Sequence, residues 1–261
     1  MKKINLFVLL IFFAGVSIGI VFPGASFAQE AANAPGSLFY QSNIYYQEGK
    51  YAEAIKSYQK ILGMGWESGN LYYNLGNSYF KEGKLGLAVL NYDRAMGFIP
   101  NDSDLRSNYD YVLQELNLEP RSFGSWFEKV AYTLFAGITA DMLAAMLSFV
   151  YILFITYLIL SLFFSRLKIY SGLVTCVFIA VFALSAYALN RKINYRDSFA
   201  IVVSGQAEAR FEPLENATVY FELGEGSRVE IVDKNENWYK VRRFDNKLGW
   251  IKKPDLVKLD I

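Results

Sequence analysis

The segment Leu71-Tyr-Tyr-Asn-Leu-Gly-Asn-Ser-Tyr-Phe80 has a weaker copy 34 residues earlier, and residues 37–68 align with 71–102 without a gap. Within each copy the apolar residues recur at spacings of three and four, which indicates helices, and a glycine between polar residues indicates a turn. A repeat of this length predicts a stack of helical pairs. The identical pairs are Asn43 and Asn77, Tyr45 and Tyr79, Glu48-Gly49-Lys50 and Glu82-Gly83-Lys84, Ala54 and Ala88, and Tyr58 and Tyr92.

The second copy resembles the tetratricopeptide (TPR) repeat. Small residues at Gly76 and Ala88 allow two helices to approach closely, and Pro100 ends the second helix. The first copy departs from the consensus at Ser42, Ile61 and Trp66. The consensus positions of the second copy are filled by Tyr72, Leu75, Gly76, Tyr79, Ala88, Tyr92, Ala95 and Pro100.

A further helix is predicted after the repeats. The run Asn101-Asp-Ser-Asp104 offers N-caps, and the residues from Leu105 to Leu116 are amphipathic. This helix would cap a solenoid that cannot leave an apolar face bare. We therefore expect a TPR domain over residues 37–116, made of two repeats and a capping helix. Five helices form a minimal array, so docking against the membrane segment or a partner is also expected.

The resemblance implies a concave, protein-binding groove. Asn43 and Asn77 occupy equivalent positions, and an asparagine amide can donate to and accept from a peptide backbone at once. Both are expected to point away from the repeat core, so removing either amide should leave the fold intact. For any single position, the alternative is a solvated polar ridge. The groove residues by resemblance are Phe39, Asn43, Tyr46, Gln47, Tyr73, Asn77, Phe80 and Lys81.

The middle of the chain is apolar. Hydrophobic residues make up 53% of the 261 residues and charged residues only 20%, and the excess lies in two uncharged runs, 142–165 and 169–190. Each run exceeds the roughly 20 residues with which a helix crosses a bilayer, so two transmembrane helices are predicted. Arg166-Leu-Lys168 leaves room only for a tight turn between them. The alternative is a buried pair of soluble helices.

The N-terminus predicts export. Met1-Lys-Lys3 precedes an uncharged run and small residues at Ser26 and Ala28, as in a signal peptide over residues 1–28, with an uncleaved anchor as the alternative. Residues 29–140 and 191–261 should then both face the periplasm from the inner membrane. Before the first span, residues 121–138 carry an apolar stripe. This amphipathic juxtamembrane segment would lie in the bilayer interface or pack on its own domain.

From Ser198 the hydrophobic period changes to two, and turn residues separate six short strands. Leu223-x-x-Gly226, Trp238-Tyr239 and Gly249-Trp-Ile251 resemble a bacterial SH3 (SH3b) domain, here over residues 198–261. Such barrels bind peptides or cell-wall stem peptides, or serve as docking modules. The predicted fold class is thus a multi-domain membrane protein with all-α TPR repeats, a two-helix transmembrane hairpin and a C-terminal all-β SH3b barrel.

Composition excludes most catalytic chemistry. The chain has no histidine and one cysteine, Cys176, so imidazole-assisted nucleophiles and Cys/His metal clusters cannot form. We expect no enzyme activity, catalytic residue, metal or cofactor. The net charge of +1 argues against a nucleic-acid partner.

The order of these parts resembles the BatE-type proteins of bacterial aerotolerance (Bat) gene clusters. That resemblance implies a non-enzymatic membrane scaffold linked to stress tolerance or envelope integrity. Its expected partners are membrane proteins with von Willebrand A domains, together with the lipid bilayer. The alternative is an envelope anchor or sensor whose barrel binds cell-wall peptides.

Overall fold

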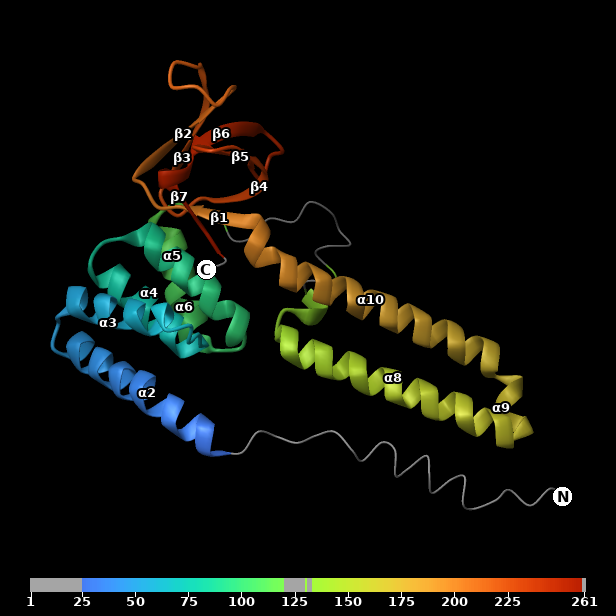
Figure 1. Ribbon diagram of the computed structural model, residues 1–261. Coiled ribbons are helices and arrows are strands. Elements are labelled where there is room, and N and C mark those ends of the chain that lie inside the picture. The colour runs from blue at the N-terminus through green and yellow to red at the C-terminus, as the bar shows by residue number, and fades with distance from the viewer. Residues whose placement is uncertain (1–24, 120–129, 131–132, 260–261) are drawn as a thin grey trace.

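The computed structural model describes residues 25–119, 130 and 133–259, so most of the predicted signal peptide lies outside the described residues. Figure 1 shows a helical stack and a β domain side by side at one end of a long helical hairpin. The predicted fold class is confirmed: helical repeats, two apolar helices and an antiparallel all-β domain. The helices of the stack are α2 (Ala25–Gln47), α3 (Tyr51–Gly63), α4 (Gly69–Lys81), α5 (Leu85–Phe98) and α6 (Ser103–Glu115).

The two repeats are built alike because their local signals are alike. The α2–α3 and α4–α5 turns each place a glycine at positive φ, Gly49 at 75° and Gly83 at 71°, a conformation that favours glycine. Ser68 caps α4, its hydroxyl accepting from the Leu71 amide at 3.2 Å. Pro100 lies just beyond the end of α5.

Close approach of α4 and α5 depends on Gly76. A Cβ atom at this position would lie 2.7 Å from the ring of Tyr92, which is only 1% exposed. The side chain of Tyr92 therefore fills the space that the missing Gly76 side chain leaves, and the two helices share one core.

Helix α6 continues the repeat. It is capped by Asp102, whose carboxylate accepts from the Leu105 amide at 2.8 Å. Its bounds, Ser103–Glu115, lie 34 residues after those of α4, Gly69–Lys81, at both ends. The helix predicted as a separate cap is thus in register as the first helix of a third repeat.

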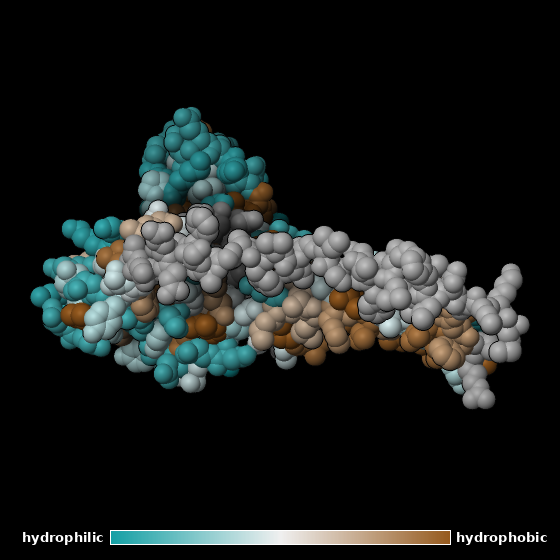
Figure 2. All heavy atoms as spheres, turned by 60° about the horizontal axis from the view of Figure 1, so that its bottom comes forward, coloured by the Kyte–Doolittle hydropathy of each residue, from teal (hydrophilic) through white to brown (hydrophobic). Residues whose placement is uncertain are grey.

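Helices α8 (Ala140–Phe163) and α10 (Ser171–Ser198) form the hairpin, with the short α9 (Ser165–Ile169) at its turn. Mean hydropathy reaches 2.4 in α8 and 2.3 in α10, and only 6% of each apolar window is buried. They are therefore not core helices of a soluble domain in this structure, and both are long and apolar enough to cross a membrane. Figure 2 shows hydrophobic side chains along the visible part of the hairpin and mostly hydrophilic ones over the soluble part.

The hairpin is attached to the soluble part in two ways. Helix α10 extends past residue 190, where the predicted span ends, and runs directly into the first strand. On the α8 side, the Asn101 amide of the α5–α6 connection donates to the Gly137 carbonyl at 2.8 Å. Most of the predicted juxtamembrane segment, 121–129 and 131–132, lies outside the described residues.

The β domain, residues 199–259, is a seven-stranded antiparallel sheet in the order β3-β2-β6-β5-β4-β1-β7. The last strand follows a 3-10 turn at Lys253–Asp255 and was not predicted, because three residues are too few to show a period. The strands are β1 (Phe199–Val202), β2 (Gln206–Arg210), β3 (Val219–Gly224), β4 (Arg228–Lys234), β5 (Trp238–Arg242), β6 (Leu248–Lys252) and β7 (Leu256–Lys258).

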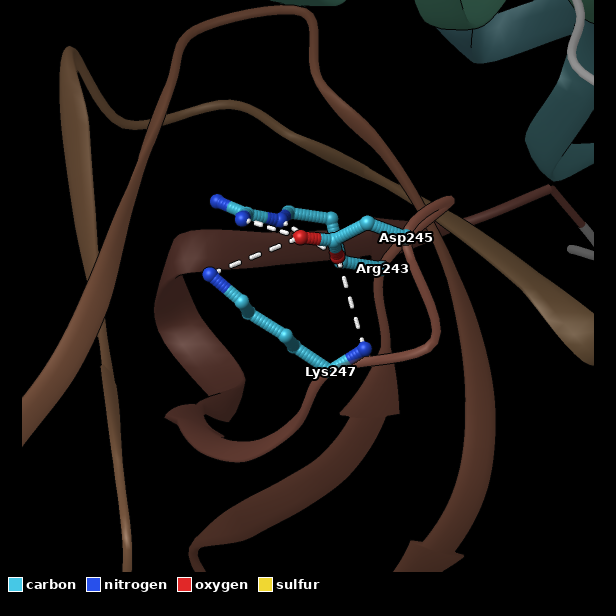
Figure 3. A network of polar contacts seen from close by, with 3 residues as sticks. All are labelled: Arg243, Asp245 and Lys247. Atoms are coloured by element: carbon cyan, nitrogen blue, oxygen red, sulfur yellow. Dashed lines mark hydrogen bonds and ion pairs between the residues drawn. The ribbon is translucent and has the colours of Figure 1, made fainter.

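The β5–β6 turn is held by local charges. Asn246 has φ 64°, and Asp245 accepts from the Arg243 guanidinium, whose Nε lies 2.8 Å from Oδ1 (Figure 3). Lys247 Nζ lies 3.6 Å from the same carboxylate. The Arg243 hydrogen bond is the main cause that holds the pKa of Asp245 well below its usual range. All three residues come from one turn, so the network shapes the hairpin and joins no separate elements.

Gly76→Ala tests the close approach of α4 and α5. The added methyl group must displace the buried Tyr92 ring, so we expect the free energy of unfolding of the full chain to fall by about 1–3 kcal/mol. The control is Gly63→Ala at the end of α3, where a Cβ meets nothing within 4 Å. Chemical unfolding in detergent micelles measures both. Equal stability of the two variants would contradict this account of the packing.

Candidate functional site

The concave side of the repeats contains a pocket of about 320 Å3. Helices α2 and α4 supply most of its wall, and Tyr58 of α3 contributes from behind them. Amide and phenol groups therefore surround a cavity with aromatic sides, which suits a peptide segment. The lining residues are Asn43, Tyr46, Gln47, Tyr58, Asn74 and Asn77.

Two asparagines connect the helices around this pocket. Asn43 Oδ1 accepts from the Tyr58 hydroxyl at 2.6 Å and from Asn74 Nδ2 at 3.0 Å. In the next repeat, Asn77 Oδ1 accepts from the Tyr92 hydroxyl at 2.7 Å and from Asn108 Nδ2 at 3.0 Å. The same three-membered arrangement thus recurs 34 residues later, with each asparagine joining its own repeat to the next.

This geometry corrects the expectation for Asn43 and Asn77. Their amide oxygens face the buried tyrosine hydroxyls and are already occupied, so neither amide both donates to and accepts from a ligand backbone. Within the described residues no hydrogen bond uses either Nδ2 group, which leaves the two N–H donors of each for a ligand. Burial is the main cause that raises the pKa of Tyr58 to about 12 and raises that of Tyr92 as well, so both phenols stay protonated as donors.

Aromatic side chains extend the groove along α4 toward α6. Phe80 meets Tyr111 of α6 edge-on at 5.8 Å between ring centroids, and Lys81 Nζ lies 5.9 Å from the Phe80 centroid. The Tyr73 hydroxyl accepts from Asn108 at 2.9 Å. At the α2 end of the groove, the rings of Tyr46 and Tyr51 meet edge-on, with 5.4 Å between their centroids.

The structure brings together half of the predicted groove residues in the pocket itself: Asn43, Tyr46, Gln47 and Asn77. Tyr73, Phe80 and Lys81 continue the surface on α4. Phe39 does not line the pocket; its ring packs against buried Tyr58 at 5.9 Å.

Four contributors were missed by the sequence analysis. They are Tyr58, Asn74, Asn108 and Tyr111, none of which is among the eight groove residues that the resemblance implies. The signal was present, because the 34-residue offset that relates Asn43 to Asn77 also relates Asn74 to Asn108 and Asn77 to Tyr111.

The β domain has a second pocket, of about 330 Å3. Trp238, which is 6% exposed, lines it, and Lys252 Nζ lies 5.7 Å from the centroid of the indole ring. Carboxylates and cations share the wall, so the pocket suits a small ligand that carries both charges. Its lining is Gln206, Glu208, Arg210, Glu222, Trp238, Lys252 and Asp255.

Comparison with protein-family models agrees with this division. Residues 35–62 and 69–102 each match a tetratricopeptide repeat, and residues 206–257 match a bacterial SH3 domain. A comparison with curated proteins finds no match. The chain therefore contains TPR repeats and a bacterial SH3 domain, two kinds of module that indicate protein or cell-wall peptide interactions.

Asn77→Ala should destabilise the chain, contrary to the sequence-based expectation. It leaves the Tyr92 hydroxyl, on a side chain that is 1% exposed, without its acceptor, which costs about 1–3 kcal/mol of unfolding free energy. Asn77→Ala/Tyr92→Phe should recover part of the loss by removing that hydroxyl.

The control is Asn70→Ala, because Asn70 is exposed on the same helix. Denaturant unfolding in micelles compares the variants. If Asn77→Ala were as stable as Asn70→Ala, the hydrogen bond to Tyr92 would carry no structural role.

Proposed function

We propose that this protein is a non-enzymatic membrane scaffold that holds a protein partner in its TPR groove. The observation that carries the proposal is the pocket of about 320 Å3 between α2 and α4, which amide donors and aromatic side chains line. Asn43 and Asn77 offer their amide nitrogens as donors, and exposed Gln47 and Lys81 lie one helical turn further along α2 and α4. These groups can bind the carbonyl groups of a partner's backbone.

The arrangement of the modules supports a role on one side of a membrane. The helical stack and the SH3 domain share a core and lie at the same end of the α8–α10 hairpin (Figure 1). With the predicted export signal, this side is the periplasm, and the hairpin anchors the groove at the inner membrane.

The partner class follows from the resemblance to BatE-type proteins. We propose membrane proteins with von Willebrand A domains, in a Bat-type complex linked to stress tolerance or envelope integrity. The SH3 pocket favours a second candidate function, an envelope anchor or sensor. Its mixed charges and Trp238 suit a cell-wall stem peptide, which carries both ammonium and carboxylate groups.

Groove variants test the scaffold against this alternative. A co-expressed membrane protein with a von Willebrand A domain should be retained by the full chain, and Gln47→Ala or Lys81→Ala should weaken its binding about three- to tenfold, because each removes one ligand contact. Lys56→Ala, exposed on α3 outside the pocket, is the control.

If Gln47→Ala and Lys81→Ala bind the partner as tightly as Lys56→Ala does, the partner does not bind in the groove. If the full chain retains no such membrane protein, its partner belongs to another class. Sedimentation of the full chain with purified cell wall, abolished by Lys252→Ala, would instead establish the anchor.

The topology makes a separate prediction. Glu67→Cys and Glu236→Cys, in a chain with Cys176→Ala, place thiols at exposed sites on the two soluble modules. Both should react with a membrane-impermeant thiol reagent once the outer membrane is permeable. Lys168→Cys in α9 is the control and should react only after the inner membrane is opened. If Lys168→Cys reacts while the inner membrane is intact and the other two thiols do not, the chain has the opposite orientation in the membrane.

A further inference from the structure

Helix α6 repeats the role of α4. Leu105 corresponds to Leu71, and both are almost fully buried. Asn108 donates to Asn77 as Asn74 donates to Asn43, at 3.0 Å in both pairs. By contacts as well as by register, α6 is the first helix of a third repeat.

The pattern of buried small residues in the second helix of a repeat does not recur at the next 34-residue offset. The residues in register with α5, 119–132, place Lys129 where Ala95 is fully buried and Ser122 where Ala88 is fully buried. A lysine ammonium group at such a packed position would lose its hydration without compensation. Within the described residues, side chains of the SH3 domain enter the core beside α5 and α6.

The SH3 domain packs against α5 and against the residues just after α6 through apolar contacts. Ile201 and Leu259, each at most 1% exposed, belong to the same hydrophobic core as the repeat helices. A Cβ atom at Gly226 would lie 2.5 Å from Leu116 Cδ1, just after α6, and 3.4 Å from Val89 Cγ2 of α5. The turn between β3 and β4 therefore fits between the two helices.

Polar contacts join the same three elements. The Arg228 guanidinium of β4 lies 2.7 Å from the Asp93 carboxylate of α5 and donates to the Tyr109 hydroxyl of α6. In the first repeat, Gln59, which is in register with Asp93, reaches the next helix directly by donating to the Tyr79 hydroxyl at 2.7 Å. Arg228 thus bridges from the second repeat to the third.

The end of the SH3 domain is held as well. Arg94 of α5, 9% exposed, donates to the backbone carbonyls of Lys258 at 2.8 Å and Leu259 at 3.1 Å. Two carbonyl partners fix the direction of the chain after β7 against the helix.

We infer that the SH3 domain braces the last helices of the repeat stack and holds α6 in position. Its surface toward the helices is then an intramolecular interface and is closed to external ligands. The groove depends on it, since α6 supplies Asn108 to Asn77 and Tyr111 to Phe80. This inference is independent of which partner the groove binds.

A pair of tyrosine variants tests the inference by hydrogen exchange in the full chain in micelles. Tyr109→Phe keeps the ring and removes the hydroxyl that meets Arg228, whereas Tyr111→Phe removes an exposed hydroxyl from the same helix. In Tyr109→Phe we expect the α6 amides to exchange roughly five- to tenfold faster, with α3 and β5 unchanged. Tyr111→Phe should match the unaltered chain.

A second pair acts from α5. A Cβ at Gly86 would lie 2.6 Å from the Val202 carbonyl oxygen, whereas a Cβ at Gly97 meets nothing within 4 Å. Gly86→Ala should therefore speed exchange in α6 by moving the SH3 domain, and Gly97→Ala should not. If Gly86→Ala unfolds the chain, Tyr109→Phe decides. Exchange in α6 that is the same in Tyr109→Phe as in Tyr111→Phe would overturn the inference.

Discussion

The buried tyrosine hydroxyl at the centre of each repeat needs an acceptor, and the asparagine of the preceding helix supplies it. Tyr58 and Tyr92 are almost fully buried, and an unpaired hydroxyl in that environment would cost as much as a large fraction of a domain's stability. The oxygen of Asn43 or Asn77 meets this need and also accepts from the next helix. One amide thereby sets both the packing within a repeat and the stacking between repeats.

That constraint shapes the candidate site. Because the oxygens of both asparagines are committed to the fold, the groove offers a ligand mainly what remains: the amide nitrogens, the exposed ends of Gln47 and Lys81, and aromatic rings. Structure and binding share the same residues, so a variant that removes a whole amide cannot separate the two roles. Residues at the rim separate them better, since they make few contacts with the core.

The SH3 domain packs against the repeat stack. Beyond the hairpin the chain returns to the repeats, and Ile201 and Leu259 of the SH3 domain pack into the same hydrophobic core as the repeat helices. Because α10 enters β1 without a linker, the hairpin, the SH3 domain and the repeats form one connected body.

Local pattern was enough to predict much of this architecture. The 34-residue offset predicted the repeats, the two uncharged runs predicted the long apolar helices, and the period of two predicted six of the seven strands. These features depend on residues close in sequence, where helical and strand periodicity are visible. Four of the eight predicted groove residues line the pocket for the same reason, since they follow one face of the repeated helices.

Only the tertiary structure decided the rest. The orientation of the Asn77 amide depends on Tyr92 and Asn108, which come from two other helices. The contact between α6 and the SH3 domain depends on Arg228, which is 135 residues from Asp93 and 119 residues from Tyr109 along the chain. No sequence pattern around Arg228 indicates either contact. Sequence alone therefore determined which segments are helices, apolar spans and strands. Contacts between distant segments decided which polar groups remain free for a ligand and which element braces the last helices of the repeat stack, because neither has a periodic signal along the chain.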